Sequence, residues 1–505
     1  MLTLIIFIPF AVALALLFVG KESQSYIRTL AVGGAGLTFL ISIGLLLAFD
    51  KTDSGMQFVE SVSWVPLLNI KYEVGVDGIS LLMVILTTLL SGIAILYSLN
   101  QKKNLRNFLA LMLLMESGIL GVFLALDTIL FYVFWELMLV PTYFMIGIWG
   151  EGRRIYATTK FVIYTLVGSL LMLVAIIAIT VVHYEATGEL TFDIQTLVHT
   201  QIDPGTQLWM FLFFFLAFAI KVPVFPLHSW VPHAYISCPV PPLVLLTGAM
   251  SKTGAYGFIR FCLPMFPDAV ADLGGTIAFA AAAGIVYGAW IAIAQKDLKA
   301  LVAYSSISHL GFITLGIFAG NGQGVEGSVL QMFNHGIIAS ALFLIVDIIE
   351  RKLGTRNLKD FRGLGHAMPL LYGVFMLIVL AALGLPGLNG FVGEFLILMG
   401  VWTSHALSDL STLLVLMGGL AIVFAAIYML YMFQGAMQET QDHLPENLTD
   451  ANRMELGLLL PACVLIVLIG LYPKPFIDRV SPSVESILTV EKTVNLHSGK
   501  KDAHH

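Results

Sequence analysis

The chain has 505 residues, of which 58% are hydrophobic and only 11% are charged, whereas soluble domains carry about 25% charged residues. With a mean hydropathy of +0.90, this composition excludes a soluble globular protein and indicates one that crosses a membrane many times. The net charge of −6 is spread over loops and tails and does not favour nucleic acid as a partner. Cys238, Cys262 and Cys463 are isolated in the sequence, so we expect no iron–sulfur centre, haem or zinc in this chain.

Apolar runs of about 18 residues or more recur from end to end, each long enough to cross a hydrocarbon core of roughly 30 Å. These runs lack strand-like alternation, and a spanning backbone must bond internally, so they predict about fourteen helices. No basic residue precedes the first run, which we interpret as a retained helix rather than a signal peptide. The predicted fold is an all-α polytopic membrane protein, with helices at residues 2–19, 27–49, 78–98, 108–126, 128–149, 157–183, 207–234, 239–262, 270–294, 297–319, 325–350, 367–402, 409–434 and 454–472.

The loops between these helices differ in charge and in pattern. The polar segment 51–78 contains short alternating stretches that favour a β-hairpin, with an irregular loop as the alternative. Short loops rich in Lys and Arg stay cytoplasmic, and the loops that carry Lys102, Arg153, Lys296 and Arg351 all fall on one side of the helix count. Both termini are therefore predicted to face away from the cytoplasm.

Two of the predicted helices are interrupted. The seventh contains Pro223 and Pro226, each of which removes a backbone donor and disrupts the turn before it. The twelfth carries Gly-Leu-Pro-Gly-Leu-Asn-Gly at 384–390, which is too rich in Gly and Pro for an unbroken helix. Paired breaks in two halves of a chain point to an ion site between repeats. The spacing predicts two inverted five-helix repeats, helices 4–8 and 9–13, in a chain divided into 1–107, 108–262, 263–435 and 436–505.

Lys221 and Glu136 are buried in apolar helices, where a charge costs a few kcal/mol and usually marks an ion path. Lys221 stands at the first break, and Glu136 is its leading partner. Burial favours a neutral amine and a nearby carboxylate favours an ammonium. Making and breaking this pair would therefore switch the lysine between holding and releasing a proton. A static ion pair that fixes helix packing is the alternative.

Further titratable residues lie at similar depth. Lys252 is too far from the nearer helix end to reach the interface comfortably, and the small residues around it allow close helix approach and leave room for water. Glu394 is a second deep carboxylate. His309 and His335 can relay protons near neutrality, with an ordinary interhelical hydrogen bond as the alternative. Glu116 is a weaker candidate of the same kind.

Five motifs closely resemble the antiporter-like membrane subunits of respiratory complex I, a family that includes Mrp antiporter subunits. Within that family, Glu at position 394 is typical of the M-type member, where the L- and N-type members have Lys. The chain also ends soon after the fourteenth predicted helix, without the long lateral helix of an L-type member. The motifs, which span most of the chain, are Phe-Trp-Glu-Leu-Met-Leu-Val-Pro at 134–141, Lys-Val-Pro-Val-Phe-Pro-Leu-His-Ser-Trp-Val-Pro at 221–232, Ser-Lys-Thr-Gly-Ala-Tyr-Gly at 251–257, Ala-Tyr-Ser-Ser-Ile-Ser-His-Leu-Gly-Phe at 303–312 and Leu-Pro-Gly-Leu-Asn-Gly-Phe-Val-Gly-Glu-Phe at 385–395.

The resemblance implies a proton-translocating subunit in the membrane arm of a bacterial NADH:quinone oxidoreductase, located in the inner membrane. L-type and N-type subunits would be its partners. FMN, iron–sulfur clusters and quinone would be held by other subunits, and this chain would carry out no redox chemistry itself. The resemblance also gives each buried group a place on a proton path: Glu136 and Lys221 as a modulating pair, Lys252 as the central relay, His309 and His335 along the axis, Glu394 as the terminal site, and Glu116 and His228 as accessory groups.

One stretch departs from the family. After the seventh helix the family usually reads His-x-Trp-Leu-Pro-Asp-Ala-His, whereas here His233 replaces the acid and Tyr235 the last histidine. This alters the cytoplasmic access to the path. His233 with His228 is the nearest replacement pair, and a loop that only caps the next helix is the alternative.

Two other functions stay open from the sequence, because a fold does not by itself define a function. One is a Mrp-type Na⁺/H⁺ antiporter subunit. The other is a membrane subunit of an energy-converting hydrogenase or another ferredoxin-linked complex.

Overall fold

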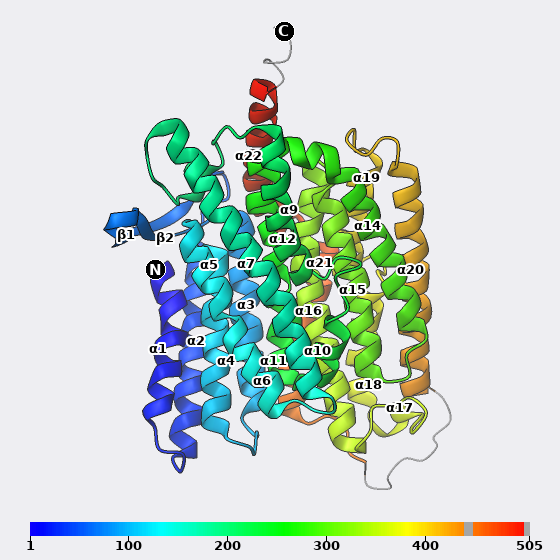
Figure 1. The fold of residues 1–505 in the computed structure, drawn as a ribbon. Helices are drawn as coiled ribbons and strands as arrows, with labels where there is room; N and C mark the ends of the chain where they lie inside the picture. Colours follow the sequence, from blue (N-terminus) through cyan, green and yellow to red (C-terminus); the bar gives the residue numbers. More distant parts are fainter. Residues whose placement is uncertain (439–447, 499–505) are drawn as a thin grey trace.

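The computed structural model describes residues 1–438 and 448–498, so part of the predicted C-terminal unit 436–505 lies outside the described residues. The helices stand side by side in one bundle (Figure 1). Among the described residues, 11 helices are long and apolar enough to cross a membrane, and α1, α18 and α19 are shorter apolar helices. The all-α polytopic class is confirmed, whereas the inverted repeats stay a prediction.

The first half of the chain follows the predicted order up to the first break. Its elements are α1 (Leu2–Phe18), α2 (Gln24–Ala48), β1 (Gln57–Val65), η1 (Pro66–Leu68), β2 (Ile70–Val76), α3 (Gly78–Ser98), α4 (Leu105–Leu124), α5 (Thr128–Leu137), α6 (Leu139–Trp149), α7 (Arg154–Thr187), α8 (Ile194–Leu197) and α9 (Pro204–Lys221).

The second half begins after the break. Its elements are α10 (Val231–Ser237), α11 (Val240–Leu245), the π-helical turn η2 (Leu246–Met250), α12 (Lys252–Gly257), the π-helical turn η3 (Phe258–Cys262), α13 (Leu263–Met265), α14 (Pro267–Ile293), α15 (Leu298–Ile317), α16 (Gly322–Leu353), α17 (Leu364–Ala367), α18 (Pro369–Ala382), α19 (Asn389–Trp402), α20 (Ser411–Phe433), the π-helical turn η4 (Gln434–Gln438), α21 (Arg453–Leu471) and α22 (Lys474–Ser498).

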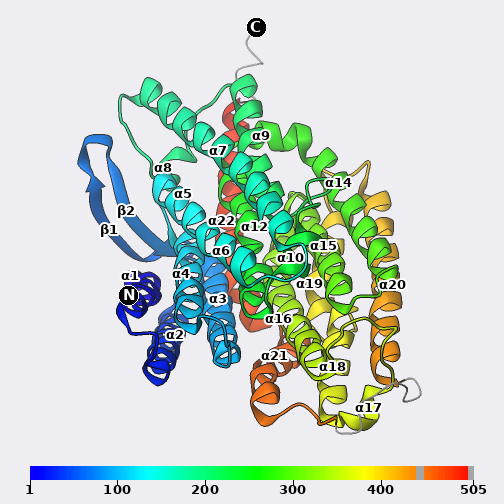
Figure 2. The ribbon, with the colours of Figure 1, turned by 60° about the horizontal axis from the view of Figure 1, so that its bottom comes forward.

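The segment 51–78 forms the predicted hairpin. β1 and β2 pair antiparallel, with Val62 opposite Tyr72, and the ribbon projects from the side of the bundle (Figure 2). The N-terminal amino group of Met1 pairs with the Glu60 carboxylate on β1. α1 begins beside the hairpin, and α22 extends to the hairpin end of the bundle (Figure 1). That both termini face away from the cytoplasm stays a prediction.

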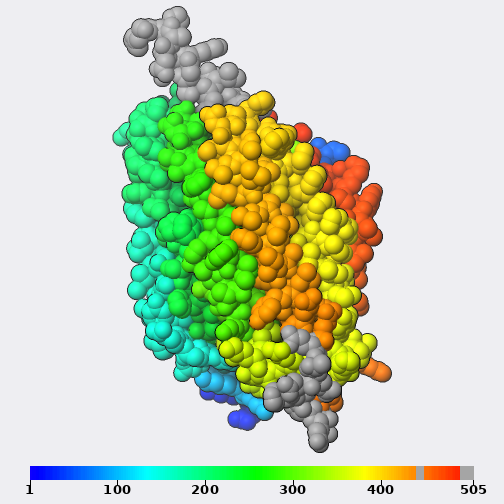
Figure 3. Space-filling model, turned by 90° about the vertical axis from the view of Figure 1, so that its right-hand side faces the viewer, coloured from blue at the N-terminus to red at the C-terminus, as the bar shows by residue number. Residues whose placement is uncertain are grey.

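Helices at the centre of the bundle differ from those at its edge. In α15 and α16, 94% of the most apolar window is buried, against 33% in α20 and 28% in α21. A helix that is apolar and covered on all sides is a core helix. Figure 3 looks onto the face that α20 forms, where Leu413, Leu416 and Val423 are exposed. We interpret this face as lipid-facing surface, and α15 and α16 as the helices on which an internal path can be built.

The C-terminal helix α22 was not predicted, because we expected only a tail after the fourteenth helix. Its composition is too polar for a spanning helix, but Val480, Val484 and Ile487 recur at helical spacing and are buried. They face inward where α22 packs against α3 and α16. At the contact with α3, the backbone N–H of Gly78 donates to Ser483 Oγ at 3.0 Å.

We expect Gly78→Ala to loosen α22. A Cβ at this position would lie 1.7 Å from the carbonyl oxygen of Arg479, and overpacking of this kind costs about 1–3 kcal/mol. Gly33→Ala in α2 is the control, since nothing lies within 4 Å of the added methyl group. Thermal unfolding of the purified protein in detergent measures both variants, and equal unfolding temperatures would contradict this packing.

Candidate functional site

The first break places Lys221 at the end of a helix inside the bundle. α9 ends at Lys221, and a helix resumes only at Val231, as α10. The indole N–H of Trp230 donates to the carbonyl oxygen of Ile220 at 2.8 Å, so a side chain supplies a donor to the broken end. The predicted interruption of the seventh helix is confirmed.

The Lys221 ammonium lies among aromatic rings. Nζ is 5.2 Å from the centroid of the Trp135 ring and 5.9 Å from that of Phe161, and the faces of such rings attract a cation. Nζ has no hydrogen-bond partner in the described part of the chain. Gly254 of α12 allows close approach here, since a Cβ on it would lie 3.0 Å from Lys221 Cβ. Lys221 therefore lies directly against the helix that carries Lys252.

Glu136 lies beside a local irregularity in the predicted helix 128–149. The structure contains this helix as one apolar span, Thr128–Trp149, in which only Met138, whose backbone is itself helical, separates α5 from α6. The cause is Pro141, which has no N–H for the carbonyl of Leu137. Glu136 Oε1 has no hydrogen-bond partner among the described residues. The carboxylate interacts with Lys221 through its charge but makes no hydrogen bond to it, so the predicted pair is not closed in this structure.

Lys252 is fully buried and has three polar neighbours. Its Nζ donates to the carbonyl oxygen of Thr247 at 2.5 Å, lies 3.3 Å from Ser251 Oγ and is 2.7 Å from His335 Nδ1. The π-helical turn η2 directly precedes it, and the N–H of Ser251 bonds Leu246 instead of Thr247. The Thr247 carbonyl is thereby left for side chains, which is why π-helical turns often mark functional sites.

Four of the predicted residues form one contact chain. The rings of His335 and His309 lie 5.7 Å apart, centroid to centroid. His309 Nδ1 is 2.8 Å from Glu394 Oε1, to which Gln331 Nε2 donates at 3.2 Å. The side chains come from α12, α16, α15 and α19 in turn, so every step of the chain Lys252–His335–His309–Glu394 crosses from one helix to another.

The second break holds Glu394 in place. α18 ends at Ala382 and α19 begins at Asn389. Asn389 Nδ2 donates to Asn334 Oδ1 at 3.2 Å, and Asn334 Nδ2 donates to the Asn389 carbonyl at 2.7 Å, which fixes the start of α19 on α16. Gly384 has a φ of +77°, and a Cβ on it would lie 3.2 Å from Glu394 Oε2. The unwound segment thus runs directly beside the carboxylate.

The chain has relatives over nearly its whole length. Residues 125–424 match the family described as NADH:quinone oxidoreductase/Mrp antiporter, transmembrane. The NADH-quinone oxidoreductase subunit M of Rhodobacter capsulatus is 37% identical, over 97% of this chain and 96% of the relative. The chain therefore belongs to the NADH:quinone oxidoreductase/Mrp antiporter family. Subunit M of Pseudomonas aeruginosa is 39% identical, over 96% of each chain, and that of Escherichia coli K12 is 39% identical, over 91% of this chain and 92% of its own. The prediction of an M-type member is confirmed.

Chains of three solved membrane complexes share the fold. A chain of respiratory complex I from Thermus thermophilus with bound NADH aligns with a TM-score of 0.88 and 32% identity, over 97% of this chain and 100% of that one. A chain of the membrane-bound sulfane sulfur reductase, an archaeal respiratory membrane complex, gives 0.80 and 25%, over 92% and 75%. A chain of the Mrp complex from Dietzia sp. DQ12-45-1b gives 0.83 and 21%, over 98% of each, and shows the fold alone.

The accessory residues lie outside the contact chain. Glu116 on α4 is fully buried, and within the described residues neither of its carboxylate oxygens has a hydrogen-bond partner. The ring of His228 lies 5.5 Å from that of Phe225 and 4.8 Å from that of Tyr287. His233 packs edge-on against Tyr156, with the ring centroids 5.1 Å apart. His228 and His233 thus have different ring neighbours, and no contact between the two side chains is seen among the described residues.

Sequence reasoning missed a buried ion pair at the far end of Lys252's helix. Arg260 pairs with Asp77, the residue that caps α3, and both side chains are less than a tenth exposed. Arg260 Nε also donates to the Tyr256 hydroxyl at 3.1 Å. The available signal was an arginine just inside a predicted apolar helix.

Across the described residues, no three or more His, Cys, Asp or Glu side chains lie together as a metal site would require.

Proposed function

We propose that this chain is a proton-translocating, M-type subunit in the membrane arm of a NADH:quinone oxidoreductase. The observation that carries the proposal is the contact chain Lys252–His335–His309–Glu394, which is buried throughout and links titratable groups on four helices. Ionisable side chains at membrane depth are costly and mark proton relays. A series of neighbouring titratable groups, with a ring contact of 5.7 Å between the two histidines, is suited to passing protons.

Proton transfer along this chain follows from its contacts. An ammonium at Lys252 donates to Nδ1 of a neutral His335, and transfer of that proton leaves a neutral amine and an imidazolium. His335 and His309 each have an Nε2 without a protein partner among the described residues, so either ring can pass a proton on through its second nitrogen. Glu394 accepts from His309 Nδ1 and is the last acceptor in the series.

Lys221 and Glu136 would modulate this transfer by charge. Since the two side chains are not hydrogen-bonded, closing or opening their contact changes the field at the neighbouring helix without breaking a network. Lys221 ends α9, which packs against α12, the helix that carries Lys252, and charges act over longer distances in a medium of low polarity than in water. A positive Lys221 would therefore oppose an ammonium at Lys252 and drive its proton onward.

The remaining assignments follow from this function. The energy comes from quinone reduction in other subunits, which hold FMN, iron–sulfur clusters and quinone, and the neighbours are L-type and N-type subunits in a bacterial inner membrane. Both termini face away from the cytoplasm. A Mrp-type antiporter subunit and a ferredoxin-linked complex are disfavoured by relatives named subunit M at 37% and 39% identity.

We expect Lys221→Ala to suppress NADH-driven proton pumping and quinone reduction while the complex still assembles, because the switching charge is lost. Glu136→Gln should give a milder loss, since the lysine stays and only its partner changes. Acidification of membrane vesicles and NADH oxidation measure both. Lys21→Ala, in the exposed link between α1 and α2, is the control. Unchanged pumping in Lys221→Ala would refute the switch.

We also expect Glu394→Lys to retain more pumping than Glu394→Ala. A lysine at this position finds acceptors in Gln331 Oε1, which has no partner among the described residues, and in Nδ1 of a neutral His309, whereas alanine removes the titratable group. The same vesicle assay compares the two variants. A lysine variant no better than the alanine variant would mean that the site requires an acid.

A further inference from the structure

A polar cavity of about 620 Å³ opens at one end of the bundle. It is lined by the ends of α3, α6 and α16 and by the first residues of α11 and α15, at the end of the bundle away from the hairpin and α22 (Figure 1). Lys102, Lys103 and Arg154 border it, and basic loops of this kind are predicted to face the cytoplasm. The cavity is therefore on the side from which protons would be taken up.

Asp347, near the end of α16, forms part of the cavity wall, and its side chain is 16% exposed. The Tyr97 hydroxyl donates to its Oδ2 at 2.6 Å, and Arg351 Nε lies 2.6 Å from the same oxygen. Because both contacts fall on Oδ2, the other oxygen can take up a proton while both contacts persist. The carboxylate is thus held in position and also reached by solvent.

Lys299, at the start of α15, lines the same cavity. It is only 2% exposed, and its Nζ donates to the carbonyl oxygen of Cys238 at 2.6 Å. Cys238 directly follows α10, and α11 begins two residues later. The ammonium therefore fixes the turn from which α11 rises into the membrane.

One face of the helix formed by α11 and η2 leads from the cavity toward Lys252. Val240 lines the cavity, and Val244, Thr247 and Ser251 follow at intervals of four, three and four residues, the spacing of one helical face. Ser251 Oγ is 3.3 Å from Lys252 Nζ. This face is apolar near the cavity and carries hydroxyl groups near the lysine.

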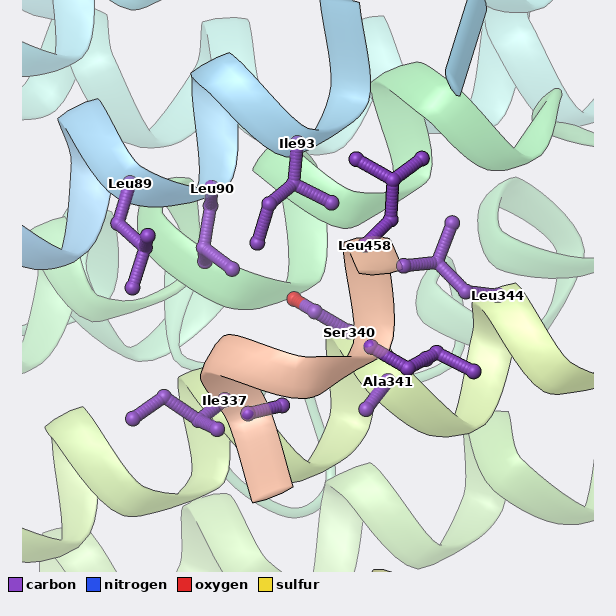
Figure 4. Close-up of a pocket in the computed structure, with 10 residues that line it drawn as sticks. Leu89, Leu90, Ile93, Ile337, Ser340, Ala341, Leu344 and Leu458 are labelled. Carbon is purple, nitrogen blue, oxygen red and sulfur yellow. The ribbon is translucent and has the colours of Figure 1, made fainter. Parts of the chain in front are cut away.

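Further hydroxyl groups lie beside this face. The buried Tyr235 hydroxyl interacts with the side chains of Thr247 and Ser251, but in the described part of the chain neither it nor Thr247 Oγ1 has a well-formed hydrogen bond. Water commonly satisfies such groups. Ser340 Oγ donates to the Val244 carbonyl at 3.2 Å. Ser340 also borders an apolar cavity of about 10 Å³, formed with Leu90, Ile93 and Leu344 (Figure 4).

We propose that the large polar cavity is the mouth through which protons reach Lys252, and that the Asp347 carboxylate collects them. The proposal rests on the function proposed above. A proton from bulk water binds Oδ1 of Asp347, leaves along the hydroxyl-bearing face and binds the neutral amine of Lys252, which becomes an ammonium. Val244 separates the two polar ends, and such an apolar constriction passes protons only when it is hydrated. Tyr97 is a positioning residue for Asp347.

The test is Asp347→Asn in the assembled complex, because asparagine keeps the shape of the side chain and its acceptor oxygen but cannot take up a proton. We expect it to lose more than half of the parent's NADH:quinone turnover and proton pumping, and Asp347→Glu to recover most of both. Acetate and imidazole are small proton carriers of opposite charge type. Each should restore turnover in Asp347→Asn and leave the parent unchanged, whereas a purely structural carboxylate would not be replaced by imidazole.

Two further variants make the outcome decisive. Asp478→Asn is the matched control, since it removes the acid of another i,i+4 pair, with Lys474 at 2.8 Å on the surface, and it should behave like the parent. Lys252→Ala separates the two proposals. Parent-like turnover in Asp347→Asn, together with lost turnover in Lys252→Ala, would overturn the proposed proton entrance and leave the proposed function standing. Parent-like turnover in Lys252→Ala would overturn the proposed function itself.

Assembly is checked on native gels. If Asp347→Asn does not assemble, Tyr97→Phe decides the question. It keeps the ring, over which the Arg351 guanidinium lies at 4.4 Å, and removes only the hydroxyl that holds the carboxylate. Reduced turnover that acetate and imidazole restore would support the mouth, and parent-like turnover would overturn it.

Discussion

A charge in the hydrocarbon core has no water around it, so the protein must supply each of its partners. Lys252 meets this requirement with a carbonyl, a hydroxyl and an imidazole. The carbonyl is available only because the π-helical turn moves the usual donor, the N–H of Ser251, to Leu246. An ideal α-helix in this place would leave the lysine with fewer partners. The π-helical turn before Lys252 therefore helps to stabilise an ammonium group in the hydrocarbon core.

The same constraint explains why the breaks and the charges coincide. Lys221 ends α9, Glu136 lies in the last turn of α5, and Glu394 lies beside the unwound segment that precedes α19. Proline or glycine interrupts the helix beside Lys221 and Glu394 and disturbs it beside Glu136, and polar backbone is tolerated at membrane depth only inside the protein. Each contact in the series Lys252–His335–His309–Glu394 joins two different helices. A proton that moves along the series therefore changes the electrostatic attraction between helices as well as the charge of a single side chain.

The sequence predicts those parts of the molecule whose signals are local. Apolar runs predict the helices, Pro223 and Pro226 predict the first break, and alternation predicts the hairpin. The position of Lys252 and Glu394 deep within apolar helices predicts that they are functional residues. Their mutual contacts could not be predicted in this way, because neighbours such as Lys252 and His335 are 83 residues apart. α22 was missed since hydropathy finds spanning helices and not amphipathic ones. The helix at 128–149 was predicted, but its local irregularity at Met138 was not, although Pro141 signals it.

The two halves of the site are in different states in this structure. Within the part of the chain that the structure describes, Lys221 Nζ and Glu136 Oε1 have no hydrogen-bond partner. Lys252 and Glu394, by contrast, each contact a histidine, and the two histidine rings lie 5.7 Å apart. If the two groups were equivalent proton channels, we would expect the lysine and glutamate of each to be linked in the same way. The difference instead suits a modulating pair beside a conducting series, since the pair can change its charge without disturbing the series. Gly254 allows α9 to pack closely against α12, so the helix that ends at Lys221 and the helix that carries Lys252 are in direct contact.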